Sequence, residues 1–427
     1  MLKPTWKRSP VLSWACYDWA NSAFATTVMA GFFPLFFKQY WAAGLDSSTS
    51  TFMLGSINAC ASILVVGFAP LLGAIADRGG SRKRFLLYFA LMGIVMTGAL
   101  YMVEQGGWVM ALALYGLAVV GFSGGNIFYD ALLLNVAKER EFDYVSALGF
   151  AFGYLGGGLL FALNVLMTLY PDAFGLPDTA AAVRLSFILV ALWWGLFSIP
   201  LLLFVDEAPS PSASWRDNLR GGISQLRTTL SELRALRQVF LFLLAYWLYI
   251  DGVDTIVRMA VDYGLALGFA SNSLILALLI TQFVGFPAAL LFGHLGERHG
   301  PRKGIVVAIA VYLLVIIWAY QMESEWEFYV LAFIIGLVQG GIQSLSRSFY
   351  ARLIPIDKAG EFFGFYNMLG KFAAVLGPLL MGGVSLLTGS PRLSILSVAL
   401  LFIAGVLVLL RVDEAEGRRQ AVALGKL

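Results

Sequence analysis

Charged and amide side chains recur inside long apolar runs of this 427-residue chain. An ionisable group at the centre of a bilayer costs about 2.5–3.5 kcal/mol on insertion scales, so such groups persist where they bind, carry protons or pair. Here they recur at three- or four-residue spacing, which places each set on one face of a helix. Side chains of these types could exchange protons through their carboxyl groups and could bind a polar solute.

The residues that we predict to line a polar cavity fall on the runs near 12–37, 108–137, 239–264, 326–352 and 361–387. They are Tyr17, Asp18, Asn21, Asn126, Asp130, Asp251, Asp254, Arg258, Gln339, Gln343, Arg347, Asn367 and Lys371. The four aspartates are candidate sites for a proton or a substrate ammonium group. The arginines and the lysine would meet a substrate carboxylate or balance these acids, so a zwitterion such as an amino acid would suit the lining.

Buried ion pairs that orient helices are the alternative interpretation of some of these charges. Asp254 and Arg258 are four residues apart on one helix and fit such a pair equally well. For the set as a whole we favour a cavity, because a membrane charge needs water or a partner.

A loop motif occurs twice at a constant offset of 220 residues, from Gly73 to Lys83 and from Gly293 to Lys303. The residues that we predict to form a cytoplasmic gate are Gly73, Asp77, Arg78, Arg82, Lys83, Gly293, Glu297, Arg298, Arg302 and Lys303. The acids could cap a facing helix N-terminus, and the arginines could bond carboxylates or helix C-terminal carbonyl groups. A loop that only sets topology would not need the same spacing twice.

Membrane helices must position these residues, because the composition does not fit a soluble domain. The chain is 59% hydrophobic and 13% charged, with a mean hydropathy of +0.80, whereas soluble domains average about 25% charged residues. Twelve apolar runs reach roughly the 20 residues that cross a bilayer, and such continuous runs predict helices rather than a barrel. They lie near 12–37, 52–76, 85–103, 108–137, 145–169, 184–205, 239–264, 272–296, 304–321, 326–352, 361–387 and 392–410.

The sequence therefore predicts an all-α membrane protein with twelve transmembrane helices in two six-helix bundles, related by a pseudo-two-fold axis along the membrane normal. We place the first bundle at 1–205, a cytoplasmic linker with an amphipathic helix at 206–238, and the second bundle at 239–427. The repeated loop favours this duplicated plan. The third run of every three carries no charge in its core and should face lipid, and the second run should slide against the other bundle.

The basic residues predict the orientation. Of the 29 Lys and Arg, 23 fall on the side that holds both termini and the repeated loops. The positive-inside rule makes that side cytoplasmic, in a multi-pass protein of the cytoplasmic (inner) membrane.

Several classes of protein lack support in the sequence. The two histidines, His294 and His299, have no metal-ligand companions at suitable spacing. There is no phosphate-binding loop with Lys and Ser/Thr and no nucleic-acid motif. We expect no enzymatic activity, metal or cofactor, and no nucleic-acid partner.

The loop pattern Gly-xxx-Asp-Arg-x-Gly-x-Arg-Lys, with its echo in the second half, resembles the signature loop of the major facilitator superfamily. Four segments resemble bacterial relatives of the fungal vacuolar amino-acid effluxer, the Atg-type branch; they are 17–24, 251–259, 340–348 and 361–364. The resemblance implies a two-bundle fold with alternating access and, for the fungal branch, amino-acid export. The second loop departs from the pattern, with Glu297 in place of Asp and an added Pro301.

We predict a secondary transporter of a small polar solute, proton-coupled and monomeric, with the lipid bilayer as its surroundings. A lipid or drug exporter is the alternative within transport, which a large apolar cavity open to lipid would favour. A receptor or scaffold that does not transport is the alternative of another class, which a sealed cavity would favour.

Overall fold

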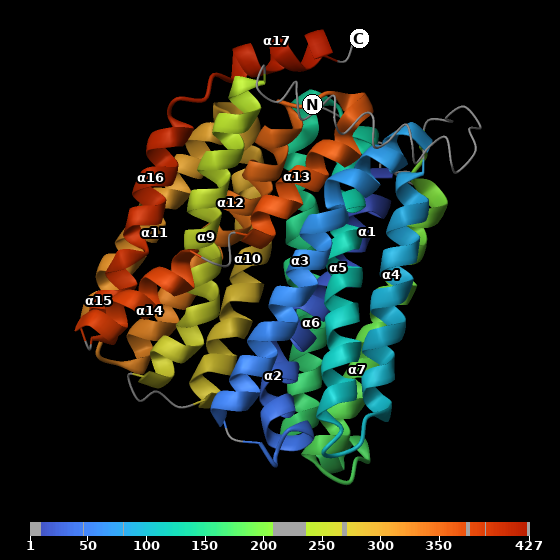
Figure 1. Ribbon diagram of the computed structural model, residues 1–427, viewed down its shortest axis with the longest axis vertical. Helices are drawn as coiled ribbons and strands as arrows, with labels where there is room; N and C mark the ends of the chain where they lie inside the picture. The colour runs from blue at the N-terminus through green and yellow to red at the C-terminus, as the bar shows by residue number, and fades with distance from the viewer. Residues whose placement is uncertain are drawn as a thin grey trace.

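The computed structural model describes residues 10–45, 47–79, 81–207, 236–266, 271–372, 376–388 and 390–424, and this part of the chain consists of helices and their connections (Figure 1). The first group of long helices comprises α1 (Pro10–Ala23), η1 (Phe24–Phe32), α2 (Phe33–Phe36), η2 (Phe37–Trp41), α3 (Ser47–Gly79), α4 (Arg82–Ala99), α5 (Trp108–Val136), α6 (Phe142–Leu169) and α7 (Thr179–Phe204). The second group comprises α9 (Arg237–Ala266), α10 (Ser271–His299), α11 (Pro301–Gln321), α12 (Glu325–Ala351), α13 (Ala359–Phe372), α14 (Leu376–Thr388), α15 (Pro391–Ser397), α16 (Ala399–Leu409) and α17 (Glu414–Leu424). Short 3-10 turns are η3 (Leu100–Met102), η4 (Glu139–Glu141), η5 (Pro171–Phe174) and η6 (Ile356–Lys358).

Within the described residues, 11 helices are long and apolar enough to cross a membrane. They match eleven of the predicted runs; in the remaining run, at 361–387, the described residues form α13 and α14, and residues 373–375 lie outside the described part. The first run continues from α1 through π-helical segments to Trp41. The predicted amphipathic helix of the linker lies outside the described residues.

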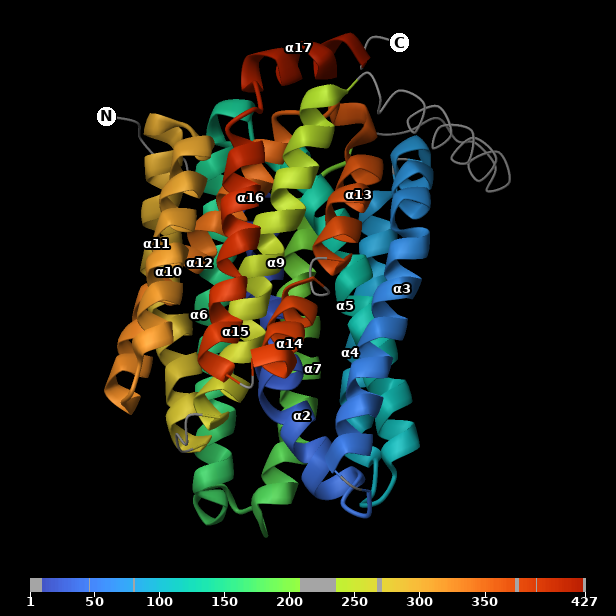
Figure 2. The ribbon, with the colours of Figure 1, turned by 60° about the vertical axis from the view of Figure 1, so that its left-hand side comes forward.

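We call α1 to α7 the first bundle and α9 to α16 the second bundle. Four helices make the main contacts between them, because α6 packs on α10 and α3 packs on α13. The connections α3–α4 and α10–α11 lie at the end of the molecule that α17 crosses (Figures 1 and 2), and we call this the basic-loop end. The residue boundaries of the two bundles stay a prediction, since most of the linker is outside the described part.

The outer helices present apolar side chains outward. Leu192 and Leu203 on α7 are 64% and 66% exposed, and Leu314 on α11 is 66% exposed. Helices without charged residues in their cores can take these positions because lipid covers them without polar partners. The helices that carry the polar residues are thereby left to form the interior.

Candidate functional site

A cavity lies between the two bundles, with an empty volume of about 1880 Å³ that includes its open mouth. Its wall runs from Asp130 and Arg347 toward Pro34 and Leu54, which lie nearer the end opposite the basic loops. The cavity is therefore open rather than sealed, and it leads away from the basic-loop end.

Nine of the predicted site residues line this cavity. They are Asp18, Asn21, Asn126, Asp130, Asp254, Gln339, Gln343, Arg347 and Asn367. Tyr17 is fully buried and does not line it, and its hydroxyl lies against Gly125. The side chains of Arg258 and Lys371 are outside the described part of the structure.

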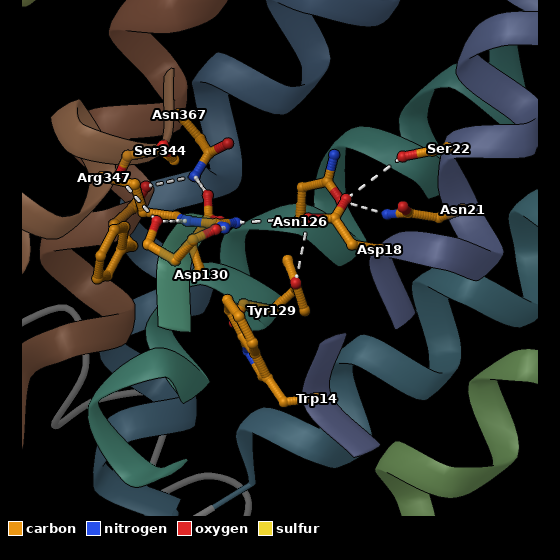
Figure 3. A network of polar contacts seen from close by, with 12 residues as sticks. Trp14, Asp18, Asn21, Ser22, Asn126, Tyr129, Asp130, Ser344, Arg347 and Asn367 are labelled. Atoms are coloured by element: carbon orange, nitrogen blue, oxygen red, sulfur yellow. Dashed lines mark hydrogen bonds and ion pairs between the residues drawn. The ribbon is translucent and has the colours of Figure 1, made fainter. Parts of the chain in front are cut away.

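Arg347 of α12 reaches from the second bundle into the first (Figure 3). Its Nε donates to Ser146 Oγ at 2.8 Å, one terminal nitrogen donates to Ser146 O at 2.7 Å, and the other donates to Asp130 Oδ1 at 3.0 Å. The guanidinium also packs over the ring of Phe150, 4.4 Å from its centroid. Arg347 is only 3% exposed, so these contacts replace the water that the charge would otherwise need.

Asp130 and Asp18 complete the charge cluster around Arg347. Asp130 Oδ2 accepts a hydrogen bond of 2.9 Å from the Asn367 amide on α13, which adds a second contact between the bundles. Asp18 lies 3.8 Å from the Arg347 guanidinium and accepts from Tyr129 at 3.1 Å. Two carboxylates from the first bundle thus face one guanidinium from the second.

Asp251 lies elsewhere, although its sequence context resembles that of Asp18. It is fully buried and does not line the cavity. Its carboxylate accepts 3.0 Å hydrogen bonds from the backbone amides of Leu376 and Gly377, the first residues of α14. A carboxylate in this position satisfies the donors at a helix N-terminus and complements the helix dipole. The geometry gives Asp251 a structural contact inside the second bundle.

Replacement of Asp251 is expected to lower stability. Asp251→Ala should cost about 1–3 kcal/mol, because two buried amides lose their acceptor. Asp251→Asn retains one acceptor oxygen and should lose less. Thermal unfolding of the detergent-purified variants measures this, and an unchanged melting temperature for Asp251→Ala would refute the capping role.

The first copy of the repeated loop joins the bundles at the basic-loop end. Asp77 Oδ1 accepts from the amide of Gly360 and Oδ2 from that of Glu361, each at 2.9 Å, at the N-terminus of α13. Arg82 Nε donates to Asp77 at 2.7 Å and its NH2 group donates to Ile356 O at 3.2 Å. The backbones approach so closely that a Cβ atom on Gly73 would overlap with the carbonyl of Gly360.

The second copy of the loop makes different contacts. Glu297 is exposed, as is Arg298, and no ion pair of either side chain is found in the described residues. Gly293 packs against Ala147 of α6, as Gly73 packs against α13. Arg302 donates to the carbonyl of Val412 at 3.1 Å, beyond the end of α16.

Each loop copy nevertheless bonds the chain beyond the last helix of its bundle. In the first bundle this is done by Lys83, whose ammonium group donates to Val205 O just after α7. Arg302, which does so in the second bundle, is the counterpart of Arg82 in the repeat. The counterpart of Lys83 in the second copy is Lys303. Of the other predicted gate residues in the first copy, Arg78 is exposed.

Other contacts between the bundles were not anticipated from the sequence. Asp143 at the start of α6 is fully buried, accepts from Ser348 Oγ and pairs with Arg352. Ser146 Oγ donates to Ser344 O at 2.8 Å. Asp143 falls between the predicted runs at 108–137 and 145–169, so the sequence places it in a connection between helices. No local pattern marks a residue whose partner is about two hundred positions away.

A second cavity, with an empty volume of about 830 Å³ that includes the open space at its mouth, lies within the second bundle and is lined mostly by apolar side chains. Val257 and Gln339 line both cavities. Within the described residues, no group of three or more metal-ligating side chains comes together.

Comparison with known proteins gives one matching family model, described as "Vacuole effluxer Atg22 like", which covers residues 6–141 and 134–422. The chain is 40% identical over 404 residues to the "Uncharacterized MFS-type transporter YxiO" of Bacillus subtilis (strain 168), covering 94% of each chain. It is 25% identical to "Autophagy-related protein 22" of Yarrowia lipolytica, over 88% of this chain and 78% of that protein.

Solved structures share the fold. The proton:xylose symporter XylE superposes with a TM-score of 0.72 at 13% identity, covering 97% of each chain. The human organic anion transporter MFSD10 superposes with a TM-score of 0.69 at 18% identity, covering 95% of this chain and 100% of that one. The twelve-helix architecture predicted from the sequence is confirmed.

Proposed function

Because the chain belongs to the Atg22-like family of major facilitator superfamily transporters, we propose that it moves a small polar solute across the cytoplasmic membrane by alternating access. The observation that carries this proposal is a polar cavity beside a set of charged contacts between the bundles, which we call the seam. The seam comprises Asp77 with the amides of α13 and Arg347 with Ser146 and Asp130, and among the described residues these contacts lie on the basic-loop side of the cavity. Closure of one end while the other admits solute is what alternating access requires.

Opening of the basic-loop end would require all the contacts of the seam to break together. Asp77 would leave the α13 amides, and Arg347 would leave Ser146 and Asp130. With the basic loops on the cytoplasmic side, as the positive-inside rule favours, the described conformation faces outward.

The cavity wall favours a solute that both donates and accepts hydrogen bonds. Several carboxamide side chains line the cavity, among them Asn21, Asn58, Gln282 and Gln343. The carboxylates of Asp18 and Asp254 line it as well. Arg347 already bonds Ser146 and Asp130 in this conformation. An amino acid is the candidate solute, with its ammonium group toward the carboxylates, and the family description favours efflux as the direction.

Asp130 offers a route by which protons would drive the cycle. A proton on its carboxyl group would weaken the bond to Arg347 and remove an acceptor facing Asn367. Both bonds connect the two bundles, so protonation there would favour separation at the basic-loop end. Asp18 faces the same guanidinium and would share this role.

Purified protein reconstituted in liposomes tests the proposal, after a thermal-shift screen of amino acids, peptides and nucleosides has found a binding solute. Asp130→Asn should retain exchange of labelled for unlabelled solute but lose accumulation driven by a pH gradient, by tenfold or more. Accumulation equal to that of the unmodified protein would contradict coupling at Asp130. Absence of binding and exchange for every solute class would contradict the proposed solute.

A lipid or drug exporter is the second candidate function, and the apolar cavity of the second bundle favours it. The cavity adjoins the polar one through Val257 and Gln339, so a solute with an apolar portion would find a place for it there. The same thermal-shift screen separates the candidates if it includes amphipathic cations and lysolipids.

A further inference from the structure

Helix α17 lies across the basic-loop end and is fixed to the second bundle (Figures 1 and 2). The backbone amide of Asp413, just before α17, donates to Gln238 Oε1 at 2.8 Å. Gly417 packs so closely on Leu353 that a Cβ atom would overlap with the leucine side chain. The bond from Arg302 to Val412 O fixes the connection from α16 as well. Helix α17 must therefore move with the second bundle.

One side chain of α17 reaches the first bundle. An Arg418 terminal nitrogen lies 3.0 Å from Glu139 Oε1 in η4, the turn that leads into α6. The other terminal nitrogen of Arg418 lies 2.6 Å from Glu414, one helical turn earlier. Arg418 is thus held in place by its own helix while it contacts the opposite bundle.

These residues belong to a chain of alternating charges that passes between the bundles twice. Asp143 of the first bundle pairs with Arg352 at the end of α12, Arg352 lies 3.7 Å from Glu414, and Glu414 pairs with Arg418. The exposed fractions of the side chains rise along the chain, in the order Asp143 0%, Arg352 10%, Glu414 29%, Arg418 40% and Glu139 52%. The inner pair is buried and strongly coupled to folding, whereas the outer pair is accessible to water.

We propose that α17 is a conformational latch that holds the basic-loop end shut through the Arg418–Glu139 contact. Opening of that end separates the bundles, so Arg418 leaves Glu139 while Glu414 and Arg352 remain on the second bundle. The contact shifts the balance toward the closed end without touching the cavity. This inference rests on the proposed alternating access and adds an element that regulates its rate.

Hydrogen exchange of the full-length protein in nanodiscs tests the latch without any solute. The amides of Gly360 and Glu361, which bond Asp77 in the closed seam, report opening of the basic-loop end through a peptide spanning 356–366. Arg418→Glu and Glu139→Arg should each raise the exchange rate about two- to fivefold, as expected for a partly exposed pair. The double variant R418E/E139R should restore most of the protection.

Arg419→Glu is the matched control, because Arg419 is 73% exposed and pairs with Glu416 of its own helix. It changes the same charge on α17 and should leave exchange within the error of the unmodified protein. Equal exchange in R418E and the unmodified protein, or no recovery in the double variant, overturns the latch. If R418E fails to fold, Glu139→Gln removes the same contact from the other side and must show the same acceleration. These results stand whether or not a transported solute is found.

Discussion

Arg347→Gln is expected to abolish transport of the solute and to destabilise the protein. The change removes the guanidinium that bonds Ser146 and Asp130, and it leaves the buried carboxylate of Asp130 and the partly exposed carboxylate of Asp18 without their cation. Loss of one partner from a buried ion pair costs about 3–5 kcal/mol, which corresponds to roughly a hundredfold to a few thousandfold in the equilibrium between closed and open seams. We therefore expect flux in proteoliposomes to fall by at least a hundredfold.

The double variant R347Q/D130N separates the structural effect from the functional one. Replacing both partners removes the unpaired carboxylate at Asp130, so the melting temperature should recover in part. Transport should not recover, because the bond that links α12 to α5 is still missing. Flux in Arg347→Gln within twofold of the unmodified protein would refute the role of Arg347 in the cycle.

Asp77→Asn is expected to open the basic-loop end. The carboxylate of Asp77 is 1% exposed and accepts from two α13 amides and from Arg82, so all three donors lose a charged acceptor. Hydrogen bonds to a charged group contribute about 1.5–3 kcal/mol each. The amide of the variant keeps one acceptor oxygen, so we expect a net loss of about 2–4 kcal/mol from the closed conformation.

Spin labels at Arg84 and Asp357, both exposed at the basic-loop end, measure this change as a distance distribution in a C16S/C60S background. A longer distance should become the main population in Asp77→Asn. Glu297→Gln is the matched control, because Glu297 occupies the same motif position 220 residues later and is exposed. It should leave the distribution unchanged, and an equal shift in both variants would show that the Asp77 bonds do not hold the seam.

The helices could be predicted from the sequence because hydropathy is a local property. Eleven of the twelve runs appear within the described residues as single candidate spans, and the described residues of the run at 361–387 form α13 and α14. The sequence of that run is compatible with a helix that begins at Leu376. Pro lacks a backbone N–H, which the first turn of a helix does not use, and Pro378 stands in the first turn of α14.

The site was harder to predict, because a spacing pattern does not say which face of a helix points inward. Asp18 and Asp251 each accept from a hydroxyl four residues later, Ser22 at 3.4 Å and Thr255 at 3.3 Å. Their surroundings differ through residues far away in the chain, since Asp18 meets Arg347 whereas Asp251 meets the amides of α14. The sequence therefore identified both as unusual residues but could not separate their environments.

The position of Asp77 on the seam, outside the residues that line the cavity, has an evolutionary consequence. Under the proposed function, mutations of charged loop residues can change the transport rate while the residues that line the cavity and contact the solute stay the same. Speed and selectivity can then drift independently among descendants of one ancestor. Arg347 is the exception, because it both lines the cavity and binds the bundles together. Under the proposed alternating access, a change of solute specificity around this arginine would therefore also change how the molecule opens and closes.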